Sequence, residues 1–258
     1  MTLIVFPDNS IYMYDCNLTE ENSEKVLSYL HSIIGKHGID VFINSHRDAD
    51  HMRGIADLHA EHPITEIWDS GVPGTTTDSP EYRAFMRLRN SLPSIEVRAR
   101  RYWTRGEAKL RCMNSRWEDF SDPNEQSLVF KVEYRKRSVI LAGDTNYRPW
   151  KEKILPYYRD EDLQSSILLA AHHGSLAFFE DPSNQRRYTD HVRKIRPDMT
   201  IVSVGPNVND LPNAEAISLY TEYSQGSNRG TTVLTTEEKG TMKLTLKDEG
   251  GWHLDMSK

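Results

Sequence analysis

The sequence has few of the features that mark secreted or membrane proteins. Only two cysteines, Cys16 and Cys112, occur among its 258 residues. This usage gives no disulfide framework or zinc-finger spacing and indicates a reducing compartment. No apolar run reaches the roughly 18 residues that a transmembrane helix needs. The opening MTLIVFPDNS has no basic segment before a long apolar stretch, so we expect no signal peptide. These absences predict a cytoplasmic protein that does not associate with membranes.

An excess of positive charge is also missing. The formal net charge is −6, so net charge alone does not indicate a nucleic-acid-binding protein. The chain has no low-complexity tract and no repeat of solenoid length. Its length suits one large α/β domain or two small ones. Because the composition shows no break, we expect a single domain over residues 1–258.

Short β-rich runs alternate with segments of helical periodicity. Residues 2–6 and 10–15 predict a β-hairpin, and a helix is expected between Thr19 and Gly35. Further strands are expected at 40–44, 128–134, 138–143, 166–171 and 200–205, helices at 148–158, 184–195 and 213–224, and a closing hairpin of 231–236 with 241–247 about Gly240. This order predicts two mixed sheets covered by helices.

Two histidines and two aspartates fall within six positions of the run SHRDADHMRG (45–54). In an extended loop, alternate residues point the same way, so His46 and Asp48 share a side. A turn then lets Asp50 and His51 present a second pair. The plain alternative is a polar loop whose aspartates cap the following helix. Capping uses one acid and leaves both histidines unexplained, so the run predicts a metal site.

Two further polar groups follow predicted strands. Asp144 comes directly after an apolar run, and His172 and His173 follow the run SILLAA. A turn aspartate and an incidental histidine pair would each be the simpler explanation if taken alone. However, α/β proteins build their sites at the carboxyl ends of strands. Three polar groups in such positions favour one shared site.

The order HxDxDHxxG, then GD, then HHGS resembles the metallo-β-lactamase superfamily. More narrowly, it resembles the hydrolase domain of ComEC-type competence proteins and its stand-alone relatives. The hairpin ending in Tyr14–Asp15, the stretch SVGPN (203–207) and the closing hairpin also resemble this family. The resemblance covers nearly the whole chain. It implies a four-layer αββα sandwich that carries divalent metal ions on its open edge and acts as a hydrolase.

The resemblance also implies a role for individual residues. His46 and Asp48 would hold one metal ion, Asp50 and His51 would hold the second, and Asp144 would bridge both. Asp48 stands where the superfamily usually has a histidine, and this hard oxygen donor favours manganese or magnesium over zinc. We expect two divalent ions, manganese or zinc, with magnesium as an alternative.

The chain departs from the superfamily pattern at two places. The mid-chain histidine has no counterpart, and Asn124 or Ser127 in the loop 122–129 is expected to line the site instead. The late histidine is also missing, and Asp210 or Asn209 is the candidate replacement. Without a replacement, the second metal position would be weak or empty.

The resemblance to phosphodiesterase members implies a mechanism. Two metal ions about 3.5–4 Å apart would acidify a shared water to hydroxide. Asp50 is expected to accept the water's proton as well as to bind metal. His172 is expected to protonate the leaving group. The alternative that His173 is the inward-facing histidine stays open.

The segment 83–116 is rich in arginine within an otherwise acidic chain. An ordinary solvated surface is the plain explanation. The functional one is a strip for a phosphate backbone, with Arg98, Arg100 and Arg101 among its contacts. Together with the resemblance, this predicts a metal-dependent nuclease that acts on DNA. The alternatives are a metallohydrolase of a small phosphoester, lactone or thioester, and a non-catalytic protein that binds metal or nucleic acid.

Overall fold

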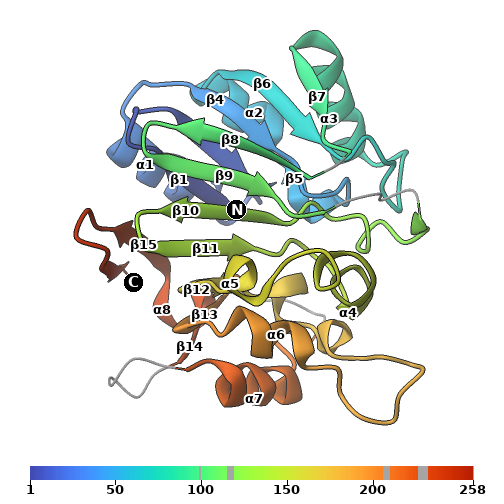
Figure 1. The fold of residues 1–258 in the computed structure, drawn as a ribbon. Helices are drawn as coiled ribbons and strands as arrows, with labels where there is room; N and C mark the ends of the chain where they lie inside the picture. Colours follow the sequence, from blue (N-terminus) through green and yellow to red (C-terminus); the bar gives the residue numbers. More distant parts are fainter. Residues whose placement is uncertain (99, 115–118, 206–209, 226–231, 258) are drawn as a thin grey trace. The chain divides into compact units, whose positions relative to one another are not determined.

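The computed structural model describes residues 1–98, 100–114, 119–205, 210–225 and 232–257. The chain divides into two units, and each is built on one β-sheet (Figure 1). Unit 1 consists of Met1–Arg98 and Phe120–Leu128, and unit 2 consists of Ala99–Asp119 and Val129–Lys258. The two expected mixed sheets are therefore present. A single domain over residues 1–258 stays a prediction.

Unit 1 is a five-stranded sheet in the order β1-β2-β4-β6-β7. Its strands are β1 (Thr2–Val5), β2 (Ile11–Tyr14), β4 (Ile39–Ile43), β6 (Ile64–Asp69) and β7 (Ser94–Glu96), and its helices are α1 (Ser23–Ile34), α2 (Ile55–Glu61) and α3 (Pro80–Ser91). The short strands β3 (Cys16–Asn17) and β5 (Met52–Arg53) form a separate parallel pair. The predicted hairpin of β1 and β2 is confirmed, and the other neighbours in the sheet are parallel.

Buried strands bring the polar loops of unit 1 to one edge of its sheet. All four residues of β2 are buried, and β4 is buried except at Asp40. All three helices contribute apolar side chains to the core on this sheet, for example Leu30, Ile55 and Phe85. Because β2 and β4 run in parallel, the loops that follow them start side by side.

Unit 2 is a seven-stranded sheet in the order β14-β13-β12-β11-β10-β9-β8. Its strands are β8 (Arg101–Arg105), β9 (Ala108–Cys112), β10 (Phe130–Tyr134), β11 (Arg137–Leu141), β12 (Ile167–Leu169), β13 (Met199–Val202) and β14 (Val233–Thr235). The pairs from β8 to β11 are antiparallel, and those from β11 to β14 are parallel.

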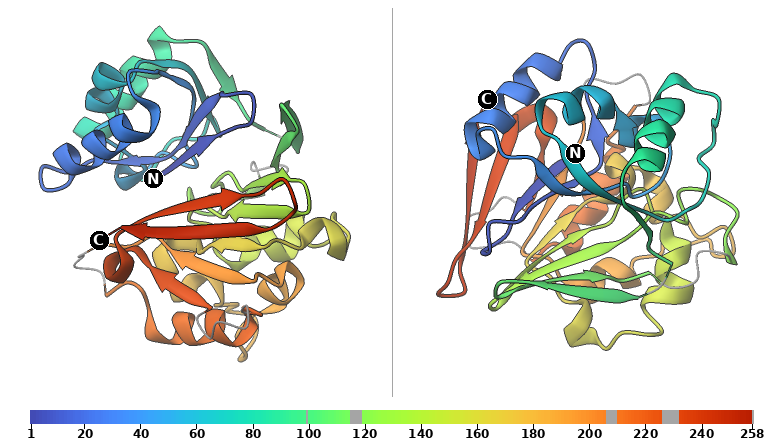
Figure 2. Two further views of the ribbon diagram at one scale, coloured as in Figure 1. Left: turned by 90° about the vertical axis from the view of Figure 1, so that its left-hand side faces the viewer. Right: turned by 90° about the horizontal axis from the view of Figure 1, so that it is seen from above.

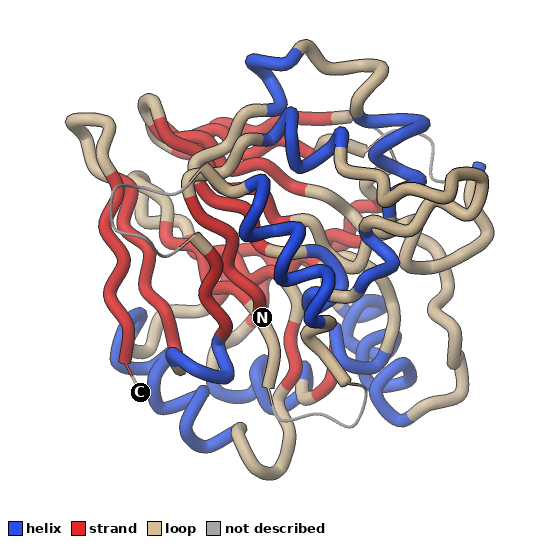
Figure 3. Tube along the Cα trace, turned by 90° about the horizontal axis from the view of Figure 1, so that it is seen from below, coloured by secondary structure: helices blue, strands red, loops and turns tan. Residues whose placement is uncertain are grey.

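The described helical segments of unit 2 are no longer than ten residues, and all helical segments of the protein are drawn in blue in Figure 3. Those of unit 2 are α4 (Tyr147–Pro149), the π-helical turn η3 (Trp150–Ile154), α5 (Asp160–Leu163), the 3-10 turns η4 (Ala171–Gly174) and η5 (Leu176–Phe178), α6 (Asp190–Ile195), α7 (Ala214–Tyr223) and α8 (Thr236–Lys239). The helix expected over 184–195 is therefore only α6. None of the helices in the described ranges combines the length and the apolar character needed to span a bilayer.

The predicted closing hairpin about Gly240 is wrong. β14 pairs in parallel with β13 at the edge of the large sheet, and α8 separates it from the strand that follows. The Thr235 hydroxyl accepts a hydrogen bond from the Glu238 amide at 3.2 Å, so residues expected to form a turn form a capped helix instead. The hairpin is made by β15 (Thr241–Leu246) and β16 (Trp252–Ser257), the red pair in the left view of Figure 2.

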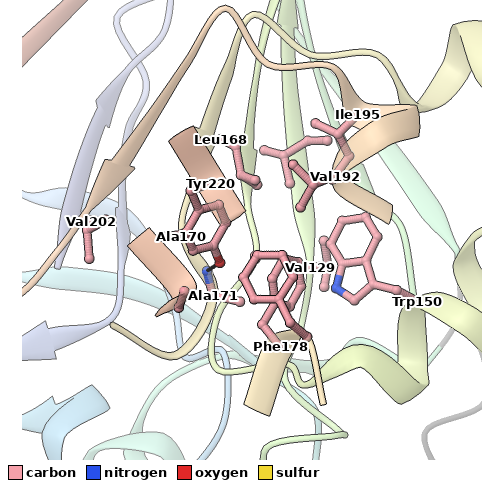
Figure 4. Close-up of a cluster of buried hydrophobic side chains, with 14 of the residues drawn as sticks. Val129, Trp150, Leu168, Ala170, Ala171, Phe178, Val192, Ile195, Val202 and Tyr220 are labelled. Carbon is pink, nitrogen blue, oxygen red and sulfur yellow. Dashed lines mark hydrogen bonds between the residues drawn. The ribbon is translucent and has the colours of Figure 1, made fainter. Parts of the chain in front are cut away.

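The main core of unit 2 holds the loops after its parallel strands in place (Figure 4). The Tyr220 hydroxyl on α7 accepts a hydrogen bond from the Ala171 amide at 3.2 Å and so anchors the start of η4. The Trp150 indole donates to the Thr145 hydroxyl at 2.9 Å, and that hydroxyl donates to the Ala142 carbonyl at 2.9 Å. Both loops therefore rest on buried aromatic side chains.

His191 is fully buried in the same core. Its ring stacks on Phe178 at a centroid distance of 4.0 Å. Nε2 donates to the Phe178 carbonyl at 2.7 Å, and Nδ1 accepts from the Val192 amide at 2.9 Å, so both nitrogens are satisfied in the neutral form. Burial lowers the pKa of His191 from 6.5 to about 4. This side chain therefore stays neutral in the folded protein at pH values where the unfolded chain is protonated.

We expect the free energy of unfolding to decrease as the pH falls from 6.5 to about 4. In this window the unfolded state binds a proton that the folded state does not, which costs about 3 kcal/mol of stability once the pH is below both pKa values. Urea unfolding between these pH values, for the wild type and for His191→Phe, measures the contribution. The stability difference between the two proteins should shrink on acidification. A difference that is independent of pH would contradict this assignment.

Candidate metal centre

The loop after β4 carries four predicted metal ligands in two pairs. His46 Nε2 lies 3.7 Å from Asp48 Oδ2, and His51 Nε2 lies 3.6 Å from Asp50 Oδ2. The expected alternation is present, because Asp48 is extended and the 3-10 turn η1 (Ala49–His51) then redirects the chain. The following helix α2 has Gly54 at its N-cap and no side-chain cap. The alternative in which these aspartates cap that helix is therefore wrong.

Asp15, directly after β2, orients this loop, and sequence reasoning did not assign it a role in the site. Its carboxylate accepts hydrogen bonds from the Ser45 amide at 2.7 Å and from the Ser45 hydroxyl at 2.8 Å. Oδ2 also lies 2.8 Å from His51 Nδ1. Because a carboxylate only accepts here, Nδ1 carries the proton and Nε2 keeps the lone pair that a metal ion needs. The one signal in the sequence was the Tyr14–Asp15 pair at the end of the first hairpin.

Ser127 contacts the site through a histidine. It is fully buried, and its hydroxyl lies 3.1 Å from His46 Nδ1, as does the Ser45 hydroxyl. The loop 122–129 therefore reaches the loop after β4 through Ser127, and substrate contact by Ser127 stays a prediction. Asn124 is half-buried, and its carbonyl accepts a hydrogen bond from the Ser127 amide at 3.1 Å. Substrate contact by the Asn124 side chain stays a prediction.

In unit 2, Asp144 follows β11, and His172 and His173 follow β12. Asp144 Oδ2 lies 3.8 Å from His172 Nε2 and 3.7 Å from His173 Nε2. His173 Nδ1 lies 2.7 Å from the Ser203 carbonyl, which only accepts, so Nδ1 donates there. The lone pair of His173 is thereby placed on Nε2, toward the carboxylate. His173 thus has the geometry of a metal ligand.

The turn that presents these two histidines is conformationally unusual. His172 and His173 have φ values of 47° and 52°, which residues other than glycine rarely adopt. Gly174 follows with φ +80°, and a Cβ atom there would lie 2.7 Å from Pro212 Cβ. The surrounding packing holds this strained turn, an arrangement that occurs mainly at functional sites.

The spacing of these donors suits a divalent metal ion. In all four histidine–carboxylate pairs described above, Nε2 lies 3.6–3.8 Å from the oxygen, which is longer than a hydrogen bond. Two donors about 2.0–2.2 Å from one tetrahedral ion lie about 3.4 Å apart. Within unit 1, Asp50 and His51 offer one such pair of donor atoms, and within unit 2, Asp144 and His173 offer another. These residues therefore fit a divalent cation.

Two residues, Asp210 and Asn209, were the candidate replacements for the missing late histidine. Asp210 is exposed and has φ 52°. Its role as a ligand stays a prediction. Asn209 lies outside the described residues.

Part of the predicted basic strip is engaged with partners inside the protein. Three of its arginines form ion pairs: Arg89 with Asp69, Arg98 with Glu96, and Arg111 with Glu133. Arg100 stacks on the Tyr157 ring at 3.3 Å and donates to the Lys153 carbonyl at 2.8 Å, and burial lowers its pKa. Arg101 is exposed, 5.3 Å from the Trp103 ring. Phosphate binding by this segment stays a prediction.

Replacing Asp15 with asparagine is expected to weaken Mn²⁺ binding about 10- to 100-fold. The amide would no longer supply two acceptor oxygens to Ser45 and His51, so the imidazole would lose its fixed orientation. Isothermal titration of the metal-free protein measures the affinity. Asp40→Asn is the control, because Asp40 also accepts a backbone hydrogen bond, from Ile11 at 2.7 Å, but contacts no predicted ligand. Wild-type affinity in Asp15→Asn would refute this role.

Comparisons with known proteins agree with the fold. The model of the metallo-beta-lactamase superfamily matches residues 1–197. CmlA, a diiron beta-hydroxylase from Streptomyces venezuelae, superposes with a TM-score of 0.52 at 16% identity, over 89% of this chain and 50% of that chain. YhfI, a metallo-beta-lactamase fold protein from Bacillus subtilis, superposes with a TM-score of 0.51 at 13% identity, over 88% of this chain and 84% of that chain. Igni18, a metallo hydrolase from Ignicoccus hospitalis, superposes with a TM-score of 0.50 at 10% identity, over 99% of this chain and 98% of that chain.

These neighbours support the fold alone, because their sequence identities are low. The chain spans about half the length of CmlA. Curated proteins provide no match. The predicted metallo-β-lactamase fold, with its mixed sheets and flanking helices, is confirmed by the family match. With three quarters of its length matched by that family, the chain belongs to the metallo-β-lactamase superfamily.

Proposed function

We propose that this protein is a metal-dependent phosphodiesterase and that its substrate is DNA. The observation that supports a metal-dependent hydrolase is the repeated pairing of an imidazole Nε2 with a carboxylate oxygen at 3.6–3.8 Å. The superfamily match supports the same class of reaction. A closer relationship to the ComEC-type hydrolase domain and a cytoplasmic location are further parts of this proposal.

The carboxylates favour phosphoryl chemistry at a hard cation. Asp48, Asp50 and Asp144 supply oxygen donors beside the imidazoles, and oxygen ligands suit Mn²⁺ and Mg²⁺. Phosphate oxygens are hard ligands of the same kind. A divalent ion bound here would lower the pKa of a bound water and neutralise charge on the phosphoryl group. We therefore favour manganese as the activating metal, with zinc and magnesium as alternatives.

Two side chains of the site are accessible enough to move protons. The Asp50 side chain is 43% exposed, so it is reachable by the attacking water and acts as the acceptor of its proton. The His172 side chain is half-buried beside Asp144. His172 donates a proton to the leaving oxygen in this proposal, whereas His173 holds metal.

A small phosphoester, lactone or thioester is the second candidate substrate. The ion pairs on Arg89, Arg98 and Arg111 favour it, because a phosphate backbone would have to compete with carboxylates already in place. A small substrate does not need an extended basic surface.

A matrix of metals and substrates tests the proposal. Protein stripped by a chelator is reloaded with Mn²⁺, Zn²⁺ or Mg²⁺ and incubated with single-stranded DNA, double-stranded DNA, RNA and a small chromogenic phosphodiester. We expect Mn²⁺-dependent cleavage of DNA. Turnover of the small ester alone would indicate that the substrate is a small molecule, the second candidate, and not DNA. Metal binding without turnover of any substrate would indicate a non-catalytic binding protein.

A further inference from the structure

The loop between β6 and α3 (70–79) reaches back to the metal loop within unit 1. A Cβ atom on Gly74 would lie 1.9 Å from the Arg47 carbonyl oxygen, so only glycine permits this approach. The buried Arg47 side chain also donates to Asp69, at the end of β6, at 2.8 Å. The two loops are therefore held together by close backbone packing and by a buried ion pair.

Thr75 gives the two oxygens of Asp48 different surroundings. The Thr75 amide donates to Asp48 Oδ1 at 2.8 Å, and the Thr75 hydroxyl donates to the same oxygen at 2.9 Å. Asp48 Oδ2 instead lies 3.7 Å from His46 Nε2, the spacing that suits two donors of one cation. One carboxylate oxygen is thus engaged by the protein, and the other is directed to the same side as the imidazole nitrogen.

We propose that Thr75 is a positioning residue that restricts Asp48 to one donor oxygen and thereby sets which cation the loop prefers. This inference rests on the proposed function only in requiring that the loop binds a divalent cation. A carboxylate with both oxygens available can bind in the bidentate mode that Ca²⁺ accepts readily at 2.3–2.6 Å. A carboxylate pinned through Oδ1 presents one oxygen in one direction, which suits smaller cations of fixed geometry such as Mn²⁺ and Zn²⁺.

The test compares wild type, Thr75→Val, Thr75→Ser and Thr76→Val. Valine keeps the shape of threonine and removes the hydroxyl, whereas serine keeps the hydroxyl. Thr76 is the exposed neighbour and serves as the matched control. Dissociation constants for Mn²⁺, Zn²⁺ and Ca²⁺ are measured by titration without substrate, and the melting temperature of each metal-free protein is measured in parallel.

We expect Thr75→Val to weaken Mn²⁺ and Zn²⁺ binding about tenfold or more while changing Ca²⁺ binding less. Thr75→Ser and Thr76→Val should match wild type, and the four melting temperatures should agree. Unchanged Mn²⁺ affinity in Thr75→Val, equal weakening for all three cations, or the same loss in Thr76→Val would overturn the inference. A wild type that binds none of the cations would overturn it together with the proposed function. The expected affinities without phosphodiester cleavage would overturn the proposed function alone.

Discussion

Replacing Asp144 with alanine is expected to abolish hydrolysis and to reduce metal affinity by at least about a hundredfold. The buried Asp144 carboxylate faces His172 Nε2 at 3.8 Å and His173 Nε2 at 3.7 Å. Without it, the two imidazoles lose the oxygen donor to which both point. Metal content after gel filtration and turnover of the substrate found in the metal matrix measure the two effects.

Asp198→Ala is the control for this substitution. Asp198 belongs to the same unit, is half-exposed, and forms an ion pair with Arg137 at 3.1 Å. Its removal should leave metal binding unchanged. Asp144→Asn keeps the shape of the side chain and checks that any loss does not come from misfolding. Full metal content and full turnover in Asp144→Ala would remove Asp144 from the site and with it the proposed chemistry.

Trp150→Ala is expected to lower the free energy of unfolding by about 3–5 kcal/mol. The indole is fully buried and packs edge-on against Phe178, at a centroid distance of 5.9 Å. Its removal leaves a large cavity under the loop that carries Asp144, and Thr145 loses the donor that anchors it. We therefore expect weaker Mn²⁺ binding as well as lower stability. Urea unfolding and metal titration measure both.

Two further tryptophan variants sharpen this prediction. Trp150→Phe keeps most of the volume and removes only the N–H donor, so it should cost less stability than Trp150→Ala. Trp252, half-buried on β16, is the matched control, and Trp252→Ala should cost less stability and leave metal affinity unchanged. A loss below about 1 kcal/mol in Trp150→Ala would contradict the role given to this side chain.

Much of the fold was predictable because its central strands are mostly apolar. The strand β12 is wholly apolar, β4 is interrupted by Asp40 and β13 by Thr200, and each strand lies within or close to its expected position. The closing segment was predicted wrongly because alternation in 231–236 and 241–247 indicates strands without specifying their partners. A helix of only four residues, α8, redirects the chain there, and its capping threonine gave no distinct signal.

The site was predictable where its residues are neighbours in the sequence. His46, Asp48, Asp50 and His51 fall within six positions, so one loop accounts for them. Asp15 approaches His51 from 36 residues away, and neither spacing nor composition indicated that contact. The ion-pair partners of the arginines could not be predicted for the same reason. Only the folded chain brings a distant carboxylate such as Asp162 within 3.7 Å of Arg111.

His51 and His173 are oriented by different kinds of group, and this difference has a genetic consequence. The partner of His51 is the Asp15 side chain, whereas the partner of His173 is the peptide carbonyl of Ser203. Any amino-acid substitution at position 15 alters the first contact, but every amino acid at position 203 still carries a carbonyl. In a saturation mutagenesis screen, substitutions of residue 15 should therefore disturb the orientation of His51. Substitutions of residue 203 should have no equivalent effect on the orientation of His173.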